Sequence, residues 1–313
     1  MKKQLLLLLL ACCQLTITFA QKNTVYLFSY FKGNGEDGLH LAYSEDAFTW
    51  HSLKNDSSFL KPTAGKDKLM RDPCIVRGPD DKFHMVWTVS WNEKGIGYAS
   101  SPDLINWSEQ QYIPLMELED SALNCWAPEI FYDRGSREYM IYWATTIPGR
   151  FPIGDTAGDG KYNHRMYYCT TKDFKKFSPT KLLYDQGFNV IDATIQKDGR
   201  KYIMFLKDET RYPPQKNIRM ATSNKLTGPY DKPSEPITGK YWAEGPTILR
   251  LGDQWVVYFD KYTEHKYGAV ASPDLKDWTD ISEQVELPKG MRHGTIFTVT
   301  TKELEKLQQI TGK

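Results

Sequence analysis

The chain repeats a unit of short strand-like segments. In four copies the first segment is an apolar run with an acidic residue at nearly the same point, and the copies are spaced by about 50–65 residues. The four acids are Asp72 in MRDPCIV, Glu129 in WAPEIFY, Asp192 in VIDATIQ and Glu244 in WAEGPTIL. A turn and a second apolar strand follow each of them. A strand repeat of this length is typical of the blades of a β-propeller.

A second signal recurs after the third strand of the unit. It is a turn that begins with Ser or Thr, has Asp two residues later and ends on an aromatic residue. Four copies occupy residues 44–50, 101–107, 171–177 and 272–278, and a degenerate copy spans 223–230. Five copies of an all-β unit predict a five-bladed β-propeller.

The two ends of the chain supply the parts of one blade. Residues 293–299 resemble an inner strand without the rest of its blade, whereas residues 24–28 and 39–43 resemble second and third strands without an inner one. We therefore expect the C-terminal inner strand to pair with the N-terminal strands and close the ring, which removes exposed sheet edges. The tail is predicted to form a short helix capped by Thr301.

The first twenty residues have the features of a secretory signal peptide. Lys2 and Lys3 precede an apolar run over residues 5–10, and Ala20 stands at the expected cleavage point. Residues 21–313 are then expected to form a single domain that is secreted or periplasmic. The alternative is a lipoprotein signal, because LLAC has the form of a lipobox. In that case Cys12 carries a lipid anchor on the outer membrane.

The composition argues against a charged polymer as partner. The chain has 40 Lys plus Arg against 39 Asp plus Glu, and no basic stripe suggests nucleic acid. Apart from the signal segment, no run is apolar enough to cross a membrane. Nineteen Tyr and nine Trp suit an uncharged ligand, although packing between blades is the default role for most of them. We expect a monomer.

The motifs at the starts of the inner strands resemble a known family. In order they are Arg71-Asp72-Pro73, Trp126-Ala127-Pro128-Glu129, Ile191-Asp192, Glu244-Gly245-Pro246 and His293-Gly294. Over nearly the whole mature chain this set resembles glycoside hydrolase family 43. The resemblance implies a five-bladed propeller that removes terminal α-L-arabinofuranosyl or β-xylosyl units from plant polysaccharides with inversion. Some members act on arabinan backbones or on β-1,3-linked galactans.

The resemblance also implies three catalytic roles. Asp72 resembles the general base that activates water, Glu244 the general acid, and Asp192 a third carboxylate that orients the acid and tunes its pKa. An inverting glycosidase needs one ionised and one protonated carboxyl group, about 6.5–9.5 Å apart. Burial and a nearby like charge can supply the raised pKa that a general acid needs.

Two further residues have less certain roles. Glu129 stands where the family pattern has an acid, and a substrate contact and a structural role fit it equally well. His293 resembles a channel-lining histidine that in many family members sits near a central calcium ion or a water. A structural histidine at the ring closure is the alternative. No cofactor is expected to be required, and a structural Ca²⁺ in the central channel is a weak expectation because Ca²⁺ prefers several oxygen ligands.

The end of each second strand lies at the same face as the start of the inner strand in an antiparallel blade. From the residues expected there, Trp91 and Trp126 are predicted to form walls against the sugar, and Asp208 or Arg292 to bind its hydroxyl groups. The long segment 147–164 is predicted to form a rim or lid.

The sequence therefore predicts an exo-acting, inverting glycoside hydrolase, with an α-L-arabinofuranosidase ahead of a β-xylosidase or an exo-β-1,3-galactanase. Its partner would be a plant-type oligosaccharide or polysaccharide. Two classes remain as rivals. A glycoside phosphorylase would use a basic cluster for phosphate, drawn from Arg150, His164, Arg165 and Arg292. A non-catalytic carbohydrate-binding propeller would bind sugar without releasing it.

Overall fold

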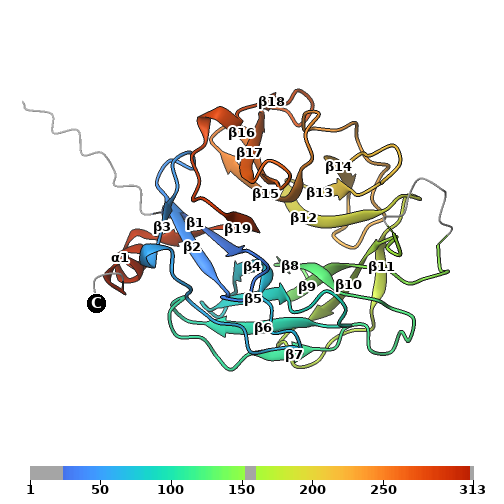
Figure 1. The fold of residues 1–313 in the computed structure, drawn as a ribbon, viewed down its shortest axis with the longest axis horizontal. Helices are drawn as coiled ribbons and strands as arrows, with labels where there is room; N and C mark the ends of the chain where they lie inside the picture. Colours follow the sequence, from blue (N-terminus) through green and yellow to red (C-terminus); the bar gives the residue numbers. More distant parts are fainter. Residues whose placement is uncertain (1–23, 152–159, 311–313) are drawn as a thin grey trace, which may run out of the picture.

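The computed structural model describes residues 24–151 and 160–310, and its sheets surround a central axis (Figure 1). Five antiparallel sheets form a five-bladed β-propeller, which confirms the predicted fold. The predicted signal segment, with Cys12, lies outside the described residues, as does part of the predicted rim, residues 152–159. Among the residues described, no helix has both the length and the apolar character needed to span a membrane.

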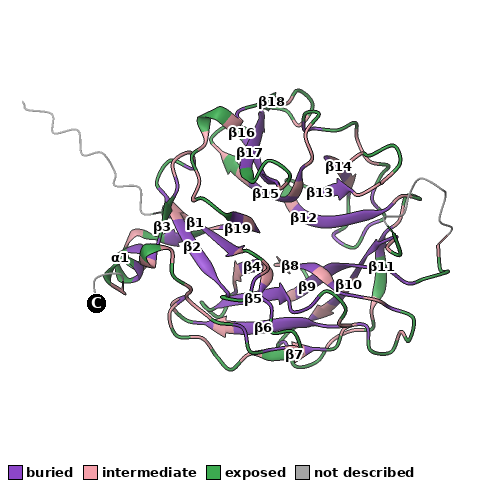
Figure 2. Ribbon diagram, viewed as in Figure 1, coloured by how far each residue is buried: buried purple, intermediate pink, exposed green. Residues whose placement is uncertain are grey.

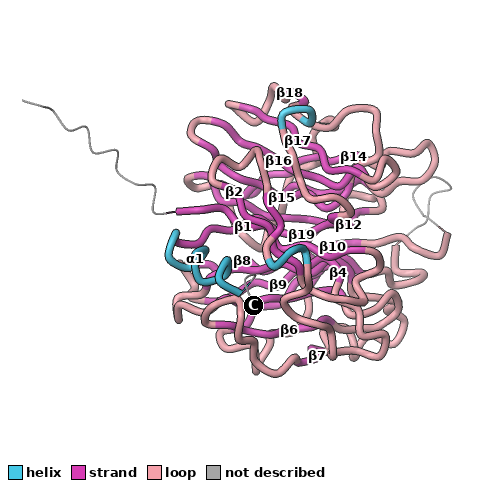
Figure 3. Tube along the Cα trace, turned by 60° about the vertical axis from the view of Figure 1, so that its left-hand side comes forward, coloured by secondary structure: helices cyan, strands magenta, loops and turns pink. Residues whose placement is uncertain are grey.

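The blade that closes the ring combines both ends of the chain. In order from the channel outward, its strands are β19 (Met291–Thr300), β1 (Thr24–Lys32), β2 (His40–Ser44) and β3 (His51–Ser52). Strands β19 and β1 are paired from Thr24 opposite Thr300 to Lys32 opposite Met291. The predicted closure is therefore confirmed, and it joins segments that are almost the whole chain apart in sequence (Figure 3).

The other four blades follow one another along the chain. The second contains β4 (Arg71–Arg77), β5 (Phe83–Thr88), β6 (Ile96–Ser101) and β7 (Gln111–Ile113). The third contains β8 (Trp126–Asp133), β9 (Glu138–Thr145), β10 (Arg165–Thr171) and β11 (Lys181–Tyr184). The fourth has β12 (Val190–Asp198), β13 (Lys201–Asp208) and β14 (Asn217–Ser223). The fifth has β15 (Glu244–Leu251), β16 (Gln254–Lys261), β17 (Lys266–Ser272) and β18 (Thr279–Asp280).

The recurring Asp turn has a structural role. In the second blade, Asp103 Oδ1 accepts hydrogen bonds from the backbone N–H groups of Ile105 and Asn106, and Leu104, between Asp103 and Ile105, is buried with φ of 64°. Asp46, Asp173 and Asp274 make the same pair of bonds in three other blades. The aspartate thus stabilises a left-handed turn that pushes an apolar side chain into the core.

The tail forms the helix α1 (Thr301–Gln309), but its N-cap is Thr300 rather than the predicted Thr301. Thr300 accepts from the Glu303 backbone N–H while the Glu303 side chain accepts from the Thr300 backbone, which makes a capping box. The helix buries Leu304 and Leu307 against the apolar cluster that also contains Val25 and Val299. It therefore covers the closing blade at the end opposite the start of β19.

The sheets bury almost all of their strands, and exposed residues are concentrated in the loops (Figure 2). The apolar core is divided into five clusters of buried side chains. Cys74, Cys125 and Cys169 are buried and free, so the described residues contain no disulfide. Packing between sheets, rather than covalent links, therefore stabilises the ring.

The closing strand depends on Gly294, because a Cβ atom there would lie 1.7 Å from the carbonyl oxygen of Ser29. We expect Gly294→Ala to lower the free energy of unfolding by about 1–3 kcal/mol, since the clash forces the strands apart. Chemical denaturation measures the change. Gly135→Ala, where the nearest atom would be 3.4 Å away, is the control and is expected to change stability by under about 0.5 kcal/mol. Equal stabilities of the two variants would contradict this account of the closure.

Candidate active site

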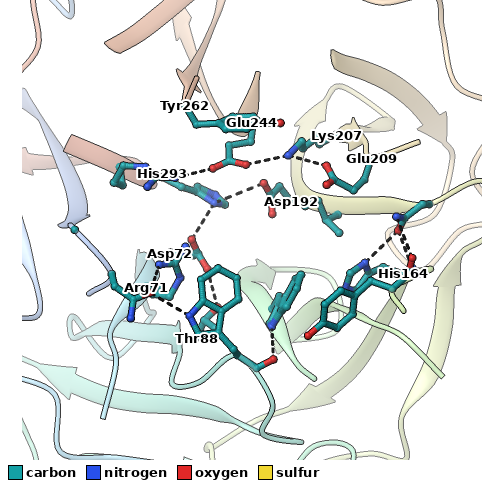
Figure 4. Close-up of a pocket in the computed structure, with 18 residues that line it drawn as sticks. Arg71, Asp72, Thr88, His164, Asp192, Lys207, Glu209, Glu244, Tyr262 and His293 are labelled. Carbon is teal, nitrogen blue, oxygen red and sulfur yellow. Dashed lines mark hydrogen bonds and ion pairs between the residues drawn. The ribbon is translucent and has the colours of Figure 1, made fainter. Parts of the chain in front are cut away.

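A pocket of about 480 Å³ opens where the five inner strands begin. This volume is in the range of small-molecule binding sites. Its lining combines four carboxylates with basic and aromatic side chains (Figure 4). The predicted residues among them are Asp72, Trp91, Trp126, Asp192, Glu244, Arg292 and His293. The pocket thus brings together side chains from all five blades.

Each inner strand enters the channel through a β-bulge. Two inner-strand residues stand opposite one on the neighbouring strand, for example between the pairs Arg71–Thr88 and Cys74–Val86, and the same irregularity occurs in all five blades. Four bulges contain a residue with a left-handed backbone: Asp72, Ala127, Asp192 and Gly245, with φ between 45° and 58°. Such bulges redirect side chains near functional sites, and here they aim Asp72 and Asp192 into the pocket.

Alignment of the bulges shows that the four repeated acids are not at equivalent positions. Counted from the left-handed residue of each bulge, Asp72 and Asp192 are that residue, Glu244 stands one position before it, and Glu129 stands two positions after it. The inner strands descend into the channel, so these acids lie at three depths. Glu244 is at the pocket rim, the two aspartates are one step deeper, and Glu129 is below the pocket.

Asp72 is held in its ionised form. Its Oδ2 accepts from the Thr88 hydroxyl at 2.7 Å, and its Oδ1 lies 3.3 Å from His293 Nδ1. Burial alone would raise its pKa, but the hydrogen bond and charge of His293 hold the pKa of Asp72 at about 2. Burial opposes protonation of His293, yet Asp72 and Asp192 raise the pKa of His293 to about 9. The pair is therefore an ion pair at neutral pH.

Asp192 and Glu244 have opposite electrostatic surroundings. Burial raises the pKa of Asp192 to about 6, a shift that the charge of His293 opposes and that of Glu244 increases. Its Oδ2 accepts from the Gly245 backbone at 3.1 Å and lies 4.0 Å from His293 Nδ1. Burial also disfavours the charge on Glu244, but Lys207 and Arg292 lower the pKa of Glu244 below its ordinary value. Of this pair, Asp192 therefore has the higher pKa and is the group that holds a proton below about pH 6.

Glu244 lies between two cations. Its Oε2 accepts from Lys207 Nζ and its Oε1 from Arg292 Nη2, both at 2.9 Å. Lys207 is buried and also lies 2.7 Å from Glu209, while Arg292 Nε donates to Asp260 at 2.5 Å. A buried ion is stable only when it is paired. This chain of alternating charges therefore fixes the rim side of the pocket.

Aromatic side chains form the opposite wall. The rings of Trp91 and Trp126 are 5.4 Å apart and perpendicular, and the Trp91 indole N–H donates to Asn34. The guanidinium group of Arg71 lies 4.3 Å from the Trp91 ring centroid. The His164 ring lies 4.7 Å from the Trp126 ring and is tilted by 38° to it, and burial lowers the pKa of His164 to about 3, so its ring is neutral. Flat apolar surface next to hydrogen-bonding groups suits a sugar ring.

Two predicted contacts lie outside this pocket. Asp208 points away from it, because side chains alternate along β13, and Lys207 and Glu209 are the pocket-lining neighbours. Its carboxylate instead lies 3.1 Å from Arg219 Nε. Glu129 lies below the pocket, where the hydroxyl groups of Thr194 and Thr295 donate to it at 3.0 and 3.2 Å. The predictions of substrate contacts for Asp208 and Glu129 are therefore corrected.

The donor set does not fit the expected channel metal. A protonated His293 has no lone pair for a metal ion, and its Nδ1–H is directed at Asp72. Burial raises the pKa of Glu129 to about 7, which weakens it as a ligand for Ca²⁺. Among the described residues, no group of three or more His, Cys, Asp or Glu side chains is placed to hold a metal ion.

The four basic residues that a phosphorylase would use for phosphate do not come together in the structure. Arg150 pairs with Glu119, and Arg165 pairs with Asp185, so neither guanidinium group lines the pocket. Only His164 and Arg292 of the four residues considered for phosphate do so. The geometry gives no support to a phosphorylase.

Sequence reasoning missed Lys207, Glu209 and Tyr262 as lining residues. A signal for Lys207 was present in the repeat. The residue of the second strand that pairs with the position before the bulge lines the pocket in two blades, as Thr88 and Lys207. To identify this second-strand residue one must know where each bulge begins, and the sequence does not mark that position. Glu209 and Tyr262 follow the second strands in loops, where no periodicity predicts direction.

A family described as "Probable glycosyl hydrolase domain" matches residues 21–305, which is most of the chain. The chain belongs to this glycoside hydrolase 43-related family. The match covers every element of the propeller and every lining residue of the pocket, so the predicted resemblance is confirmed.

One curated relative of this family 43-related chain is an alpha-L-arabinofuranosidase from Bifidobacterium longum, 25% identical over 259 residues. The alignment covers 70% of this chain but 24% of the relative, so the chain spans about a quarter of that protein.

Solved structures share the fold. An alpha-L-arabinofuranosidase from Lactobacillus brevis has a TM-score of 0.52 at 19% identity, covering 67% of this chain and 72% of that one. A family 43 beta-1,3-galactosidase has a TM-score of 0.57 at 14% identity, covering 80% and 54%. An exo-beta-1,3-galactanase from Phanerochaete chrysosporium has a TM-score of 0.53 at 12% identity, covering 71% and 52%.

The His293–Asp72 ion pair predicts a pH-dependent contribution to stability. Because the pKa of His293 is about 9 when folded and about 6.5 when unfolded, its contribution is complete below pH 6.5 and is lost as the pH rises through 9. We expect His293→Asn to be less stable than the parent by on the order of 3 kcal/mol at pH 6, and by less at pH 10. Denaturation at several pH values measures this. A difference that stays constant with pH, as expected for the exposed control His265→Asn, would contradict the ion pair.

Proposed function

We propose that this protein is an inverting, exo-acting glycoside hydrolase that removes terminal α-L-arabinofuranosyl units from plant oligosaccharides or polysaccharides. The observation that carries the proposal is one pocket that holds an ionised Asp72, paired with His293, together with the Asp192–Glu244 pair, in which the pKa of Asp192 is raised to about 6. Inverting hydrolysis requires this combination of a base and an acid. The family membership and the arabinofuranosidase relative support the reaction class and the sugar.

In the proposed reaction Asp72 accepts a proton from a water molecule as that water attacks the anomeric carbon. The bond from this carbon to the leaving oxygen breaks, and Glu244 gives that oxygen a proton. Attack opposite the leaving group inverts the anomeric configuration. Thr88 and His293 keep the Asp72 carboxylate ionised and oriented.

The proton for Glu244 comes from Asp192 in this proposal. In the empty pocket the two cations hold Glu244 ionised. When sugar hydroxyl groups bind Lys207 and Arg292, the interaction of these two cations with Glu244 becomes weaker. The proton then moves from Asp192 to Glu244. Asp192 thus has the third role that the family resemblance implies, as the group that sets the protonation of the acid.

The nearest alternative activities differ from the proposed one in the sugar that is removed. A β-xylosidase or an exo-β-1,3-galactanase would use the same carboxylates, and galactan-degrading enzymes occur among the structural neighbours. A pocket of about 480 Å³, bounded by side chains from all blades, favours attack at a chain end. A non-catalytic binding propeller has no use for carboxyl groups with pKa values held apart, which favours the enzyme.

The proposal includes export. Residues 1–20 have the features of a signal peptide. Cleavage after Ala20 is the preferred processing, and lipid attachment at Cys12 is the alternative. The N-terminal sequence of the mature protein decides between them: a start at Gln21 supports cleavage, and a lipidated Cys12 supports the anchor.

The catalytic roles predict distinct responses of two variants. Glu244→Gln is expected to lose about 10²–10⁴-fold in rate on natural linkages but little on an aryl glycoside, whose leaving group needs no proton. Asp72→Asn is expected to lose both activities, because water must still be activated. Release assays on aryl glycosides of α-L-arabinofuranose, β-D-xylose and β-D-galactose, beside a natural oligosaccharide, measure this and identify the sugar.

The same assays can refute the assignment. If Asp192→Asn, and not Glu244→Gln, spares only the aryl glycoside, then Asp192 is the proton donor. Retained aryl-glycoside turnover in Asp72→Asn excludes that residue as the base. Tight binding of an oligosaccharide by the parent protein, with no release from any substrate, would favour the binding propeller.

The pKa values also predict a pH profile. The acid must be protonated, so kcat/KM on a natural linkage should fall as the pH rises through about 6, where the Asp192–Glu244 pair loses its proton. The base remains ionised down to about pH 2, so no fall is expected between pH 6 and pH 4. An aryl glycoside should lack the fall above pH 6. A profile of the same shape for both substrates would contradict the shared proton.

A further inference from the structure

A second groove lies near the pocket on the side of Glu244, since Trp242 of the groove is 5.9 Å from Tyr262 of the pocket between ring centroids. We propose that Tyr262 and Trp242 form consecutive subsites for the sugars on the leaving-group side, so that the substrate is a chain with at least two units beyond the bond that is cut. The inference rests on the proposed function, because it takes Glu244 as the residue next to the leaving oxygen. The inference adds binding sites for the sugar units beyond that oxygen.

Tyr262 adjoins the acid. It follows β16 and lines the pocket, close to Glu244 and Lys207 (Figure 4). Lys207 Nζ lies 4.5 Å from the centroid of the Tyr262 ring and 2.9 Å from Glu244 Oε2. The leaving group of a sugar positioned for protonation by Glu244 therefore meets the tyrosine ring. An aromatic face of this kind suits the apolar face of a sugar.

Trp242 continues the path by one more ring. It stands two residues before Glu244, at the entry to β15, and its ring centroid is 5.9 Å from that of Tyr262. Both side chains are half-buried, so each offers a surface to a ligand. Arg211 lies 5.8 Å from the Trp242 ring centroid and adds hydrogen-bond donors at the same edge.

A groove of about 370 Å³ begins at Trp242. Pro214 and Pro236 contribute apolar surface to it, and Gln215 and Thr238 contribute polar groups. Apolar faces between amide and hydroxyl groups are the chemistry that recognises neutral sugars. The side chains of this groove come from the loops that follow β13 and precede β15, which border the catalytic pocket.

The apolar core does not account for the two rings. Across the described residues, neither Tyr262 nor Trp242 belongs to any of the five apolar clusters or packs against one. The neighbouring Tyr241, by contrast, packs against the cluster around Phe259. The two rings instead lie beside the ammonium groups of Lys207 and Lys216, 4.5 and 5.8 Å from their centroids, and their half-exposed surfaces can stack on a sugar.

The first test compares substrates of different length. Trp242→Ala is expected to reduce kcat/KM on arabino-oligosaccharides of three to five units about 3- to 10-fold more than on the aryl arabinofuranoside, which does not reach this ring. The loss should appear mainly as a raised KM, and Trp242→Phe should restore most of it. Leu182→Ala, on the exposed strand β11, is the control and should change neither substrate.

The second test measures binding without turnover. In the Asp72→Asn background, affinity for arabino-oligosaccharides is expected to rise with each added unit up to three, and Trp242→Ala should remove the last increment. Equal losses on both substrates, or affinity independent of length, would overturn the subsites. A parent protein that releases sugar from no substrate refutes the proposed function, and the binding series then decides on the subsites alone.

Discussion

The pairing of β19 with β1 is the interaction on which the rest of the molecule depends. It joins the two ends of the chain in one sheet, so every blade has two neighbours and the ring is closed. The same pairing places Arg292 and His293 at the mouth of the channel. Without them Glu244 would lose one of its two cations, and Asp72 would lose the proton donor that keeps it ionised. Closure of the fold and assembly of the site are thus one event.

The bulge at the start of each inner strand turns a structural repeat into a chemical site. A regular strand would send alternate side chains into the sheet packing. The extra residue re-aims the side chain at the bulge, and a left-handed backbone costs about 1–3 kcal/mol at each non-glycine position. At Gly245 the absence of a side chain is required, because a Cβ atom would lie 2.4 Å from the His293 ring. Packing of the surrounding sheets maintains this strain.

The charges in the pocket form a balanced network rather than a set of independent groups. His293 faces both Asp72 and Asp192, and the cations on either side of Glu244 are themselves paired with Glu209 and Asp260. Removing one member changes the pKa values of the others, which is how Asp72, Asp192 and Glu244 are kept in different protonation states. The pKa values of Asp72 and Asp192 diverge because Asp72 lies closer to His293, at 3.3 Å against 4.0 Å, and accepts from Thr88, whereas burial and the charge of Glu244 raise the pKa of Asp192.

The sequence by itself determined the number of blades, the closure and the carboxylates that meet in the pocket. Strand periodicity and repeated turns are local properties, and a propeller converts equivalent positions into a shared axis. Only the tertiary structure decided the depth and direction of each side chain. Glu129 fell below the pocket because it follows the bulge of β8, and Lys207 rather than Asp208 lines the pocket because side chains alternate along β13. The tertiary structure also decided the protonation states of the carboxyl groups, because these states depend on burial and on charges from blades distant in sequence.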